Sequence, residues 1–251
     1  SILFHYVALK GNGTVWTWGR NNYGQLGLGD TTNRTEPEEV KAERTSEKGT
    51  TQEEITDAID VAAGVHHTLI LRKDGTVWAA GRNDYGQLGN GNTEKSTIFH
   101  QVKGENGIGY LQNIVQIVSE KYTSHALTAD GSIYSWGYNY YGQFGNKTTN
   151  GNASTYPEKM QKVSNIIQIT AGEHHISMLD ADGSIWSTGC NSNGQFGTGT
   201  TQSENVLPTQ MLDTDGSVLY GVREIASGRD HTVLIKEDNT VWSVGYNGYG
   251  Q

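Results

Sequence analysis

Histidine has the widest chemical repertoire of the residues in this chain, and four histidines recur at one place in a repeated pattern. Each lies seven residues before a recurrent turn; they are His5, His67, His175 and His231, with Thr123 at the same place in a weaker copy. A metal site needs several such side chains within about 2.1 Å of one ion. Equivalent residues of successive repeats instead occupy separate places. The pattern therefore favours a packing or hydrogen-bonding role for each histidine, and no metal site is expected.

The other chemical motifs are weak. The sequence contains no G-x-S-x-G, H-E-x-x-H or phosphate-binding loop. Two segments, Asp180 to Gly183 and Asp213 to Gly216, begin like calcium loops, but neither continues with the ligand set that a full loop needs. Turn chemistry explains both segments. We therefore expect no enzyme activity and no cofactor.

Arginine and tyrosine recur immediately after a repeated glycine. This register contains Arg20, Arg82, Tyr138 and Tyr246, with Cys190 in the fourth copy. Both residue types are enriched at binding hot spots of protein interfaces. A second register, three residues later, holds Tyr23, Tyr85, Tyr141, Asn193 and Tyr249, which can instead pack over the glutamines that follow within the turn. The first register predicts contacts with a partner protein.

The elements that must position these side chains form a repeat. Five segments align without gaps, and their shared glycines are Gly19, Gly81, Gly137, Gly189 and Gly245, spaced by 62, 56, 52 and 56 residues. Each segment follows an apolar run and a turn such as Asp74-Gly75, and Asx-Gly pairs favour two-residue hairpin loops. The unit, about 56 residues long, is therefore predicted to contain a β-hairpin.

The second predicted strand of each unit is uncharged on both faces. One face carries Val15 or its equivalent and a small residue, and the other carries a large aromatic residue; the aromatic residues are Trp16, Trp78, Tyr134, Trp186 and Trp242. A sheet that is apolar on both faces must be covered on both faces. Repeated sheets achieve this by stacking around an axis. The sequence therefore predicts an all-β chain that folds as a β-propeller, with these aromatic residues buried between blades.

The repeat also carries a family resemblance. It reads A-G-x-x-H-[TS] before the turn and then W-G-x-N-x-x-G-Q-[LF]-G, as in Trp18-Gly19 and Gly24-Gln25-Leu26-Gly27. This pattern resembles the repeat of the regulator of chromosome condensation family, which implies a propeller usually of seven blades. Because the chain holds four and a half units, we expect a partial ring of four to five blades from a seven-bladed parent. A closed five-bladed ring is the alternative.

The predicted organisation is a single domain over residues 1–251, interrupted by connectors of varying length. The longest connector, residues 30–56, is charged and shows no strand pattern. Residues 36–57 contain eight acidic and three basic side chains, over half the excess in a chain of net charge −9. Nucleic acids are bound through clustered lysine and arginine, so none is expected as a ligand. No run of about 18 apolar residues is present, so no membrane insertion is expected.

The sequence favours a non-catalytic protein-binding scaffold that contacts its partner through variable loops on one face. The alternative, which the resemblance implies, is a guanine-nucleotide exchange factor or regulator of a small GTPase. The plant photoreceptor branch of the family has tryptophans immediately after the glycine of G-x-x-H, where this chain has Val65, Lys121, Glu173 and Arg229, so photoreception by that mechanism is not expected. The low lysine content and the Asn-x-Ser/Thr triplets, one of them at Asn152, favour an extracellular or cell-surface location over a cytoplasmic one.

Overall fold

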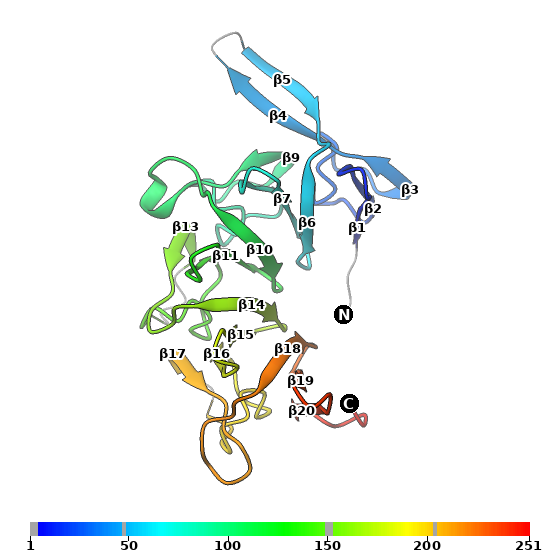
Figure 1. The fold of residues 1–251 in the computed structure, drawn as a ribbon. Helices are drawn as coiled ribbons and strands as arrows, with labels where there is room; N and C mark the ends of the chain where they lie inside the picture. The colour runs from blue at the N-terminus through cyan, green and yellow to red at the C-terminus, as the bar shows by residue number, and fades with distance from the viewer. Residues whose placement is uncertain (1–4, 47–48, 149–152, 203–204) are drawn as a thin grey trace.

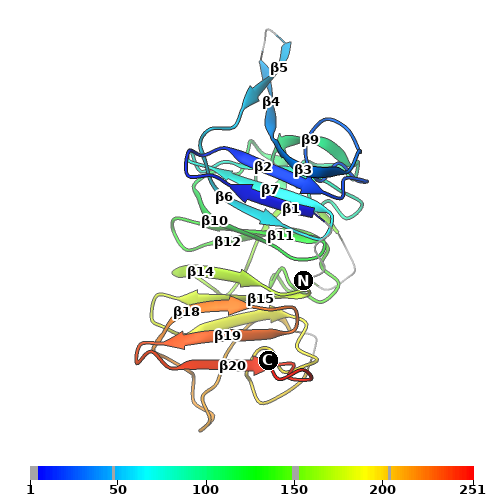
Figure 2. The same cartoon turned by 90° about the vertical axis from the view of Figure 1, so that its right-hand side faces the viewer.

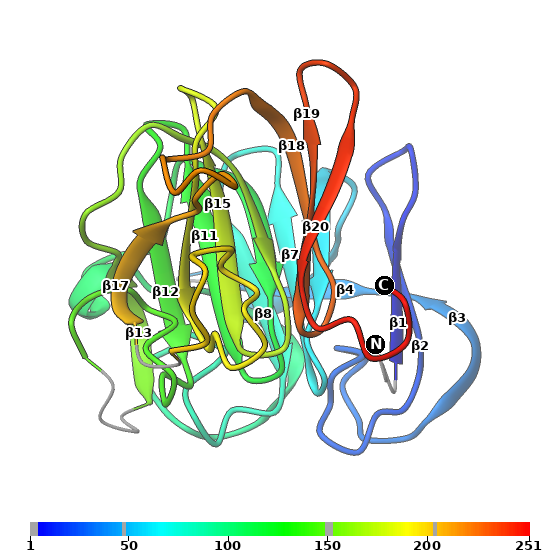
Figure 3. The same ribbon diagram turned by 90° about the horizontal axis from the view of Figure 1, so that it is seen from below.

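The regular structure of the chain is almost entirely β. The computed structural model describes residues 5–46, 49–148, 153–202 and 205–251, so Asn152 lies outside the described residues. Apart from a short 3-10 turn, η1 (Glu105–Gly107), the regular elements in these ranges are strands. The strands form five sheets arranged one after another along an arc (Figure 1), and Figures 2 and 3 show the sheets stacked beside one another.

Each sheet contains one blade, whose strands follow one another in chain order. The sheet of blade 2 also includes β4 (Lys41–Ser46) and β5 (Gly49–Glu54), which join it through a parallel pairing of Ala42 with Phe99. Blade 1 contains β1 (His5–Leu9), β2 (Val15–Gly19) and β3 (Arg34–Glu39), and blade 2 contains β6 (Ala58–Ala63), β7 (His67–Arg72), β8 (Val77–Gly81) and β9 (Ser96–Gln101). Blade 3 contains β10 (Ile114–Ser119), β11 (Thr123–Thr128), β12 (Ile133–Gly137) and β13 (Ser154–Lys159). Blade 4 contains β14 (Ile166–Ala171), β15 (His175–Asp180), β16 (Ile185–Gly189) and β17 (Asn205–Gln210), and blade 5 contains β18 (Val222–Ser227), β19 (His231–Lys236) and β20 (Val241–Gly245). The structure confirms an all-β partial ring of propeller blades.

The hydrophobic core lies between neighbouring blades. One cluster combines Leu69 and Val77 of blade 2 with Ile117 and Trp136 of blade 3, and three similar clusters join the other neighbouring pairs. The valine or isoleucine that begins the second strand of blades 1 to 4 is at most 1% exposed. Each blade is therefore stabilised mainly by the blades beside it, as expected for a repeat protein.

The aromatic residues of the second strand are less buried than the sequence predicts. Trp78 is 8% exposed, but Trp16, Tyr134 and Trp186 are only half-buried, and Trp242 is 46% exposed. Trp136, two residues after Tyr134, is the fully buried aromatic residue of blade 3, and its Nε1 donates to the Gln87 carbonyl at 2.9 Å. Neighbouring sheets therefore cover most of these second-strand rings only in part.

A hydrogen-bonded relay explains the indole positions. In blade 2 the Thr76 hydroxyl donates to Asp74 Oδ1 at 2.6 Å and accepts from Trp78 Nε1 at 3.1 Å. The same relay links Asn12, Thr14 and Trp16, and also Asp238, Thr240 and Trp242. The turn residue therefore sets the orientation of the ring that follows it.

The recurrent histidines connect adjacent blades. His67 on β7 and His175 on β15 are fully buried, and their Nε2 atoms lie 3.0 Å from Ser124 Oγ and 3.3 Å from Thr232 Oγ1 of the next blade. Burial is the main cause that lowers the pKa of each histidine, to about 3. His5 makes the same contact with Thr68 at 2.8 Å, whereas His231 in blade 5 is half-buried. Each of these three contacts holds a neutral imidazole between two blades.

Blade 3 departs from the pattern at three linked positions. Glu120 occupies the place of the glycine in A-G-x-x-H, Thr123 that of the histidine, and His125 that of Leu69 in blade 2. His125 Nε2 lies 3.2 Å from Glu120 Oε1, and its Nδ1 lies 2.8 Å from Ser135 Oγ. All four side chains are buried. The arrangement resembles a catalytic triad in composition, but solvent has almost no access to it, so we interpret it as a structural network.

The segment over residues 30–56 is not the strandless connector that the sequence predicts. Its first part is β3, which pairs with β2 and completes the described sheet of blade 1. The rest forms a hairpin, β4 (Lys41–Ser46) and β5 (Gly49–Glu54), which projects from the body of the molecule (Figure 1). At its base Val40, Ala42 and Ile55 are fully buried in the core between blades 1 and 2. The sequence shows no strand pattern here because β3, β4 and β5 contain few apolar residues.

Candidate functional site

The candidate site is the loop face, formed by the loops that follow β2, β8, β12, β16 and β20 and by the loops that precede the recurrent histidine positions. Gly81 has φ of 117°, and a Cβ there would overlap the carbonyl of His66. The next residue, Arg82, donates its backbone N–H to that carbonyl at 2.9 Å. The equivalent bond joins Tyr138 to Tyr122 at 3.0 Å. The recurrent glycine thus places the two loops of each blade side by side.

The glycine equivalents have the same conformation. Their φ values are 99° at Gly19, 96° at Gly137, 106° at Gly189 and 112° at Gly245. A residue with a side chain rarely adopts such values. The position after each glycine is therefore fixed by the backbone, independently of which side chain it carries.

A recurrent asparagine holds each loop after the strand. Asn21, Asn83, Asn139 and Asn191 are buried, and each accepts a hydrogen bond at Oδ1 from the backbone N–H five residues later, at 2.9 to 3.0 Å. Each also donates from Nδ2 to the carbonyl nine residues later. The side chain replaces regular strand pairing inside the loop. The residues beside it are consequently presented on a rigid backbone.

Aromatic rings form a continuous aromatic band across the loop face. Its members, in order of contact, are Tyr23, His66, Tyr122, Tyr85, Tyr138, Tyr140, Tyr141 and His174. Successive ring centroids lie between 4.6 and 6.4 Å apart, within the range of favourable aromatic pairing. The band runs from the loop after β2 in blade 1 to the loop that precedes β15 in blade 4.

Arg82 is held within this band. Its guanidinium carbon lies 5.1 Å from the ring centroids of both Tyr23 and Tyr122, and its Nη2 lies 2.6 Å from Asp84 Oδ2. Cation–π contacts contribute about 0.5–1 kcal/mol at exposed sites and more where water is excluded. The side chain is therefore ordered by three neighbours before any partner binds.

The two histidines of the band are neutral rings at pH 7. Burial, followed by the charges of Arg82, Arg20 and Lys121, lowers the pKa of His66 to about 4. Burial also lowers the pKa of His174. The rings therefore contribute apolar and hydrogen-bonding surface, not positive charge.

A charged cluster lies beside the band. Lys121 Nζ is 2.7 Å from Glu173 Oε1, and Arg229 pairs with the other oxygen of the same carboxylate. Burial acts to raise the pKa of Glu173, but its hydrogen bond with Lys121 and the nearby positive charges outweigh this effect and lower it. These three residues occupy the position directly after the glycine of G-x-x-H or its equivalent in blades 3, 4 and 5. They give the face charges of both signs.

The structure brings two of the four predicted contact residues into one network. Arg82 and Tyr138 both belong to it, through Tyr122 and Tyr85. Arg20 is half-buried and close enough to His66 to influence its pKa. Tyr246 is 38% exposed and contacts Tyr249 at 6.0 Å in blade 5.

Sequence reasoning missed the residues that complete the band. His66, Tyr122 and His174 share one register, immediately before the recurrent histidine position, and this shared aromatic character was the available signal. The second tyrosine register is tied to the glutamines through the backbone. Gln25 Oε1 accepts from the Tyr23 backbone at 3.0 Å, and this bond recurs in the other copies, while the Tyr23 ring contacts His66.

The described ranges hold neither a metal-binding cluster nor a membrane-spanning helix. Among those residues, no group of three or more histidine, cysteine, aspartate or glutamate side chains is arranged to hold a metal ion. The same ranges contain no helix with the length and apolar character needed to cross a membrane.

Curated proteins with similar sequences contain this repeat within longer chains. Human E3 ubiquitin-protein ligase HERC2 is 30% identical over 244 residues, which cover 97% of this chain and 5% of HERC2. The ultraviolet-B receptor UVR8 of Arabidopsis thaliana is 30% identical over 248 residues, which cover 97% of this chain and 52% of UVR8. This chain therefore spans about half of UVR8 and a small part of HERC2.

Solved structures show the same fold. Human WBSCR16 superposes with a TM-score of 0.77 at 21% identity, over 98% of this chain and 62% of that one. Yeast RCC1 (Prp20), in its complex with Kap60, gives a TM-score of 0.65 at 22% identity, over 97% of this chain and 68% of that one. The regulator of chromosome condensation (RCC1) repeat matches residues 12–71, 74–119, 130–179 and 182–235. With that repeat along most of its length and the blades described above, the chain belongs to the RCC1-repeat family.

Proposed function

We propose that this chain is a non-catalytic protein-binding scaffold whose partner docks on the loop face, over Arg82, Tyr138 and the rest of the aromatic band. The observation that carries the proposal is the arrangement of Arg82 between Tyr23 and Tyr122 inside a continuous row of rings. Binding loses affinity when flexible side chains must be ordered on association. Here the contacts within the band have already ordered them.

Related structures support a role in protein recognition. One contains Kap60 bound to yeast RCC1, and another study of Prp20p addresses its binding to Gsp1p and histones. The partner of the present chain is a separate question, because those proteins share about a fifth of its residues. The mixed charges of Arg82, Lys121 and Glu173 favour a partner surface that carries aromatic or aliphatic groups together with both signs of charge.

The test is a comparison of matched variants. Arg82→Ala combined with Tyr138→Ala removes two members of the network, whereas Tyr220→Ala removes a tyrosine that is 53% exposed near the turn end of blades 4 and 5. A captured partner is purified, and its affinity for each variant is measured by calorimetry. We expect the double variant to lose at least about tenfold in affinity, because hot-spot residues commonly contribute over 1 kcal/mol each.

Two outcomes contradict this proposal. Equal affinity of the double variant and the wild type would move the interface away from the aromatic band. Acceleration of guanine-nucleotide release from a small GTPase by the wild type would replace the scaffold role with that of an exchange factor. Thermal melts of all three proteins separate a loss of binding from a loss of folding.

A further inference from the structure

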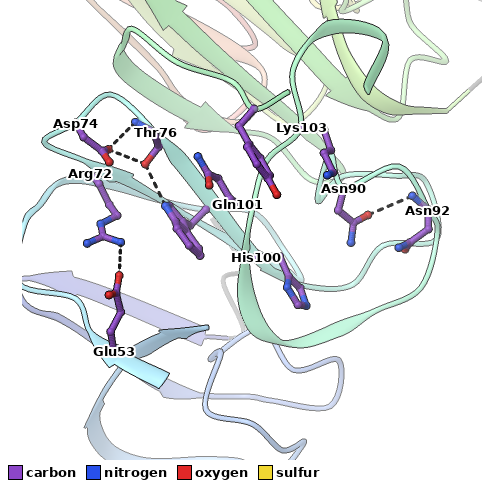
Figure 4. Close-up of a pocket in the computed structure, with 11 residues that line it drawn as sticks. Glu53, Arg72, Asp74, Thr76, Asn90, Asn92, His100, Gln101 and Lys103 are labelled. Atoms are coloured by element: carbon purple, nitrogen blue, oxygen red, sulfur yellow. Dashed lines mark hydrogen bonds and ion pairs between the residues drawn. The ribbon is translucent and has the colours of Figure 1, made fainter. Parts of the chain in front are cut away.

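A recess lies on the outer rim of blade 2. It encloses about 540 Å³ and is lined by side chains from β7, β8 and β9, from the turn before β8 and the loop after it, from the connection after β9, and from β5 of the projecting hairpin. Figure 4 shows Arg72 with Glu53 on one side of the recess and Asn90 with Asn92 on the other. The projecting hairpin and several parts of blade 2 thus meet at one cavity.

The lining chemistry selects a neutral polar ligand. None of the eleven lining residues is aliphatic. Arg72 and Lys103 balance Glu53 and Asp74 in charge, and Arg72 is already paired with Glu53 at 2.9 Å. A strongly charged ligand would leave one of these groups unbalanced, which is costly where water is partly excluded.

Two aromatic rings frame the recess. The indole of Trp78 is fixed by the bond from its Nε1 to Thr76, and Thr76 is bonded to Asp74. Tyr110 is 47% exposed, and Lys103 Nζ lies 4.6 Å from its ring centroid. Ring faces of this kind pack against the C–H groups of a cyclic polar molecule.

Side-chain amides supply the hydrogen-bonding groups. Asn90 Oδ1 accepts from Asn83 Nδ2 at 3.1 Å, and Asn92 Oδ1 accepts from the backbone of Glu94 at 2.8 Å. These bonds orient the two amides, and both residues line the recess. Gln101 adds a side chain that can both donate and accept. Planar amides beside aromatic rings match a molecule with several hydroxyl groups on one ring.

We propose that this recess binds a saccharide, with a sugar ring against the exposed ring of Tyr110 and its hydroxyl groups bonded to Asn90, Asn92 and Gln101. A peptide fits less well. Peptides dock through apolar anchor pockets or unpaired strand edges. The recess has no aliphatic wall, and β9 is paired with β8 on one side and contacts β4 on the other.

A neighbouring cavity extends the site. It encloses about 430 Å³, shares Tyr110 with the first recess, and lies beside Tyr134, the blade 3 equivalent of Trp78. Asp130 and Ser132 of the blade 3 turn also line it. Glu105 and the aliphatic Ile108 and Leu111 line it as well, so its lining differs from that of the first recess. The saccharide is therefore placed in the first recess, and a longer chain can reach Tyr134 from there.

The test uses defined hexasaccharides with the full chain: cellohexaose, chitohexaose, maltohexaose and xylohexaose. Binding is measured by saturation-transfer difference NMR and by calorimetry. We expect at least one of them to bind, and Tyr110→Ala and Gln101→Ala each to weaken it by about tenfold or more. Tyr220→Ala is the matched control and should leave affinity unchanged. Arg82→Ala with Tyr138→Ala should also leave it unchanged, which separates this site from the loop face.

Failure of all four sugars to bind would overturn the proposal. Binding that persists at wild-type affinity in both Tyr110→Ala and Gln101→Ala would overturn it as well. Both positions lie on the rim surface, and a thermal melt of each variant verifies that it is folded. Tight binding of an unrelated acidic or basic peptide, displaced by no sugar, would assign the recess to a peptide instead.

Discussion

His67 of blade 2 lies against Ser124 of blade 3, with 3.0 Å between Nε2 and Oγ, and Ser124 donates onward to the Gln87 carbonyl at 2.9 Å. The relay crosses the blade boundary and returns to the loop after β8. Because His5 and His175 make the corresponding contacts, the same buried group joins blades 1 and 2, 2 and 3, and 4 and 5, whereas blade 3 has Thr123 at this position. The protonation state of these histidines therefore affects the stability of the whole ring segment.

Stability should fall as the pH is lowered below about 6.5. Burial lowers the pKa of His67 and His175 in the folded state to about 3, whereas the unfolded chain binds a proton near its usual pKa of 6.5. Between these values the unfolded state holds more protons, so each histidine removes about 1.4 kcal/mol of stability per pH unit. We expect a free energy of unfolding that is nearly constant above pH 7 and decreases steeply toward pH 5, as measured by urea titration.

The variant His67→Gln isolates one of these contributions. Glutamine does not titrate and can still bond to Ser124. It should lower stability at pH 7.5 by about 1–2 kcal/mol and reduce the loss between pH 7.5 and 5. An equally large loss in variant and wild type would show that His67 is protonated in the folded state or exposed.

The two tryptophan registers should differ in their contribution to stability. Trp136 is fully buried, so Trp136→Ala should cost about 3–5 kcal/mol. Trp186 is half-buried against the core between blades 3 and 4, so Trp186→Ala should cost less, about 1–3 kcal/mol. Urea unfolding of the two variants checks the order. A larger cost for Trp186 would mean that it, and not Trp136, fills the interface between blades.

The buried network of blade 3 should be sensitive to the loss of a single member. Glu120→Ala leaves His125 Nε2 and Gln143 Nε2 without the carboxylate that they contact at 3.2 and 3.4 Å. We expect a cost of about 2–4 kcal/mol, because unsatisfied buried polar groups are expensive. The measurement is the free energy of unfolding at pH 7.5.

A compensated variant serves as its control. Glu120→Gly, Thr123→His and His125→Leu together give blade 3 the residues found at these positions in blade 2. This triple variant should recover most of the stability that Glu120→Ala loses. If the single and triple variants are equally unstable, the three residues do not act as one network.

The sequence predicts the blades because their signals are local and repeated. The Asx-Gly turns, the glycines such as Gly81 and the alternation around Val77 each depend on a few neighbouring residues. The aromatic band depends instead on which residues of adjacent blades meet, and His66 contacts Tyr23 from 43 residues away. The partial burial of Trp186 likewise depends on how blades 3 and 4 pack together, which the periodicity of one strand does not predict. Such features can be predicted only when the positions of the neighbouring blades are known.

The last prediction concerns the projecting hairpin: the effect of shortening it on stability depends on which residues are replaced. Replacing residues 43–52 with Asn-Gly joins Ala42 to Glu53, which are already paired across β4 and β5, and leaves the buried Val40 and Ile55 in place. Shortening a hairpin at its far end removes little core, so stability should change by less than about 1 kcal/mol. Replacing residues 36–57 with a Gly-Ser linker also removes most of β3 and all three buried side chains, and should cost several times more. Circular dichroism melts of the two variants compare them, and equal melting temperatures would show that β3 and the base of the hairpin contribute nothing to the core of blades 1 and 2.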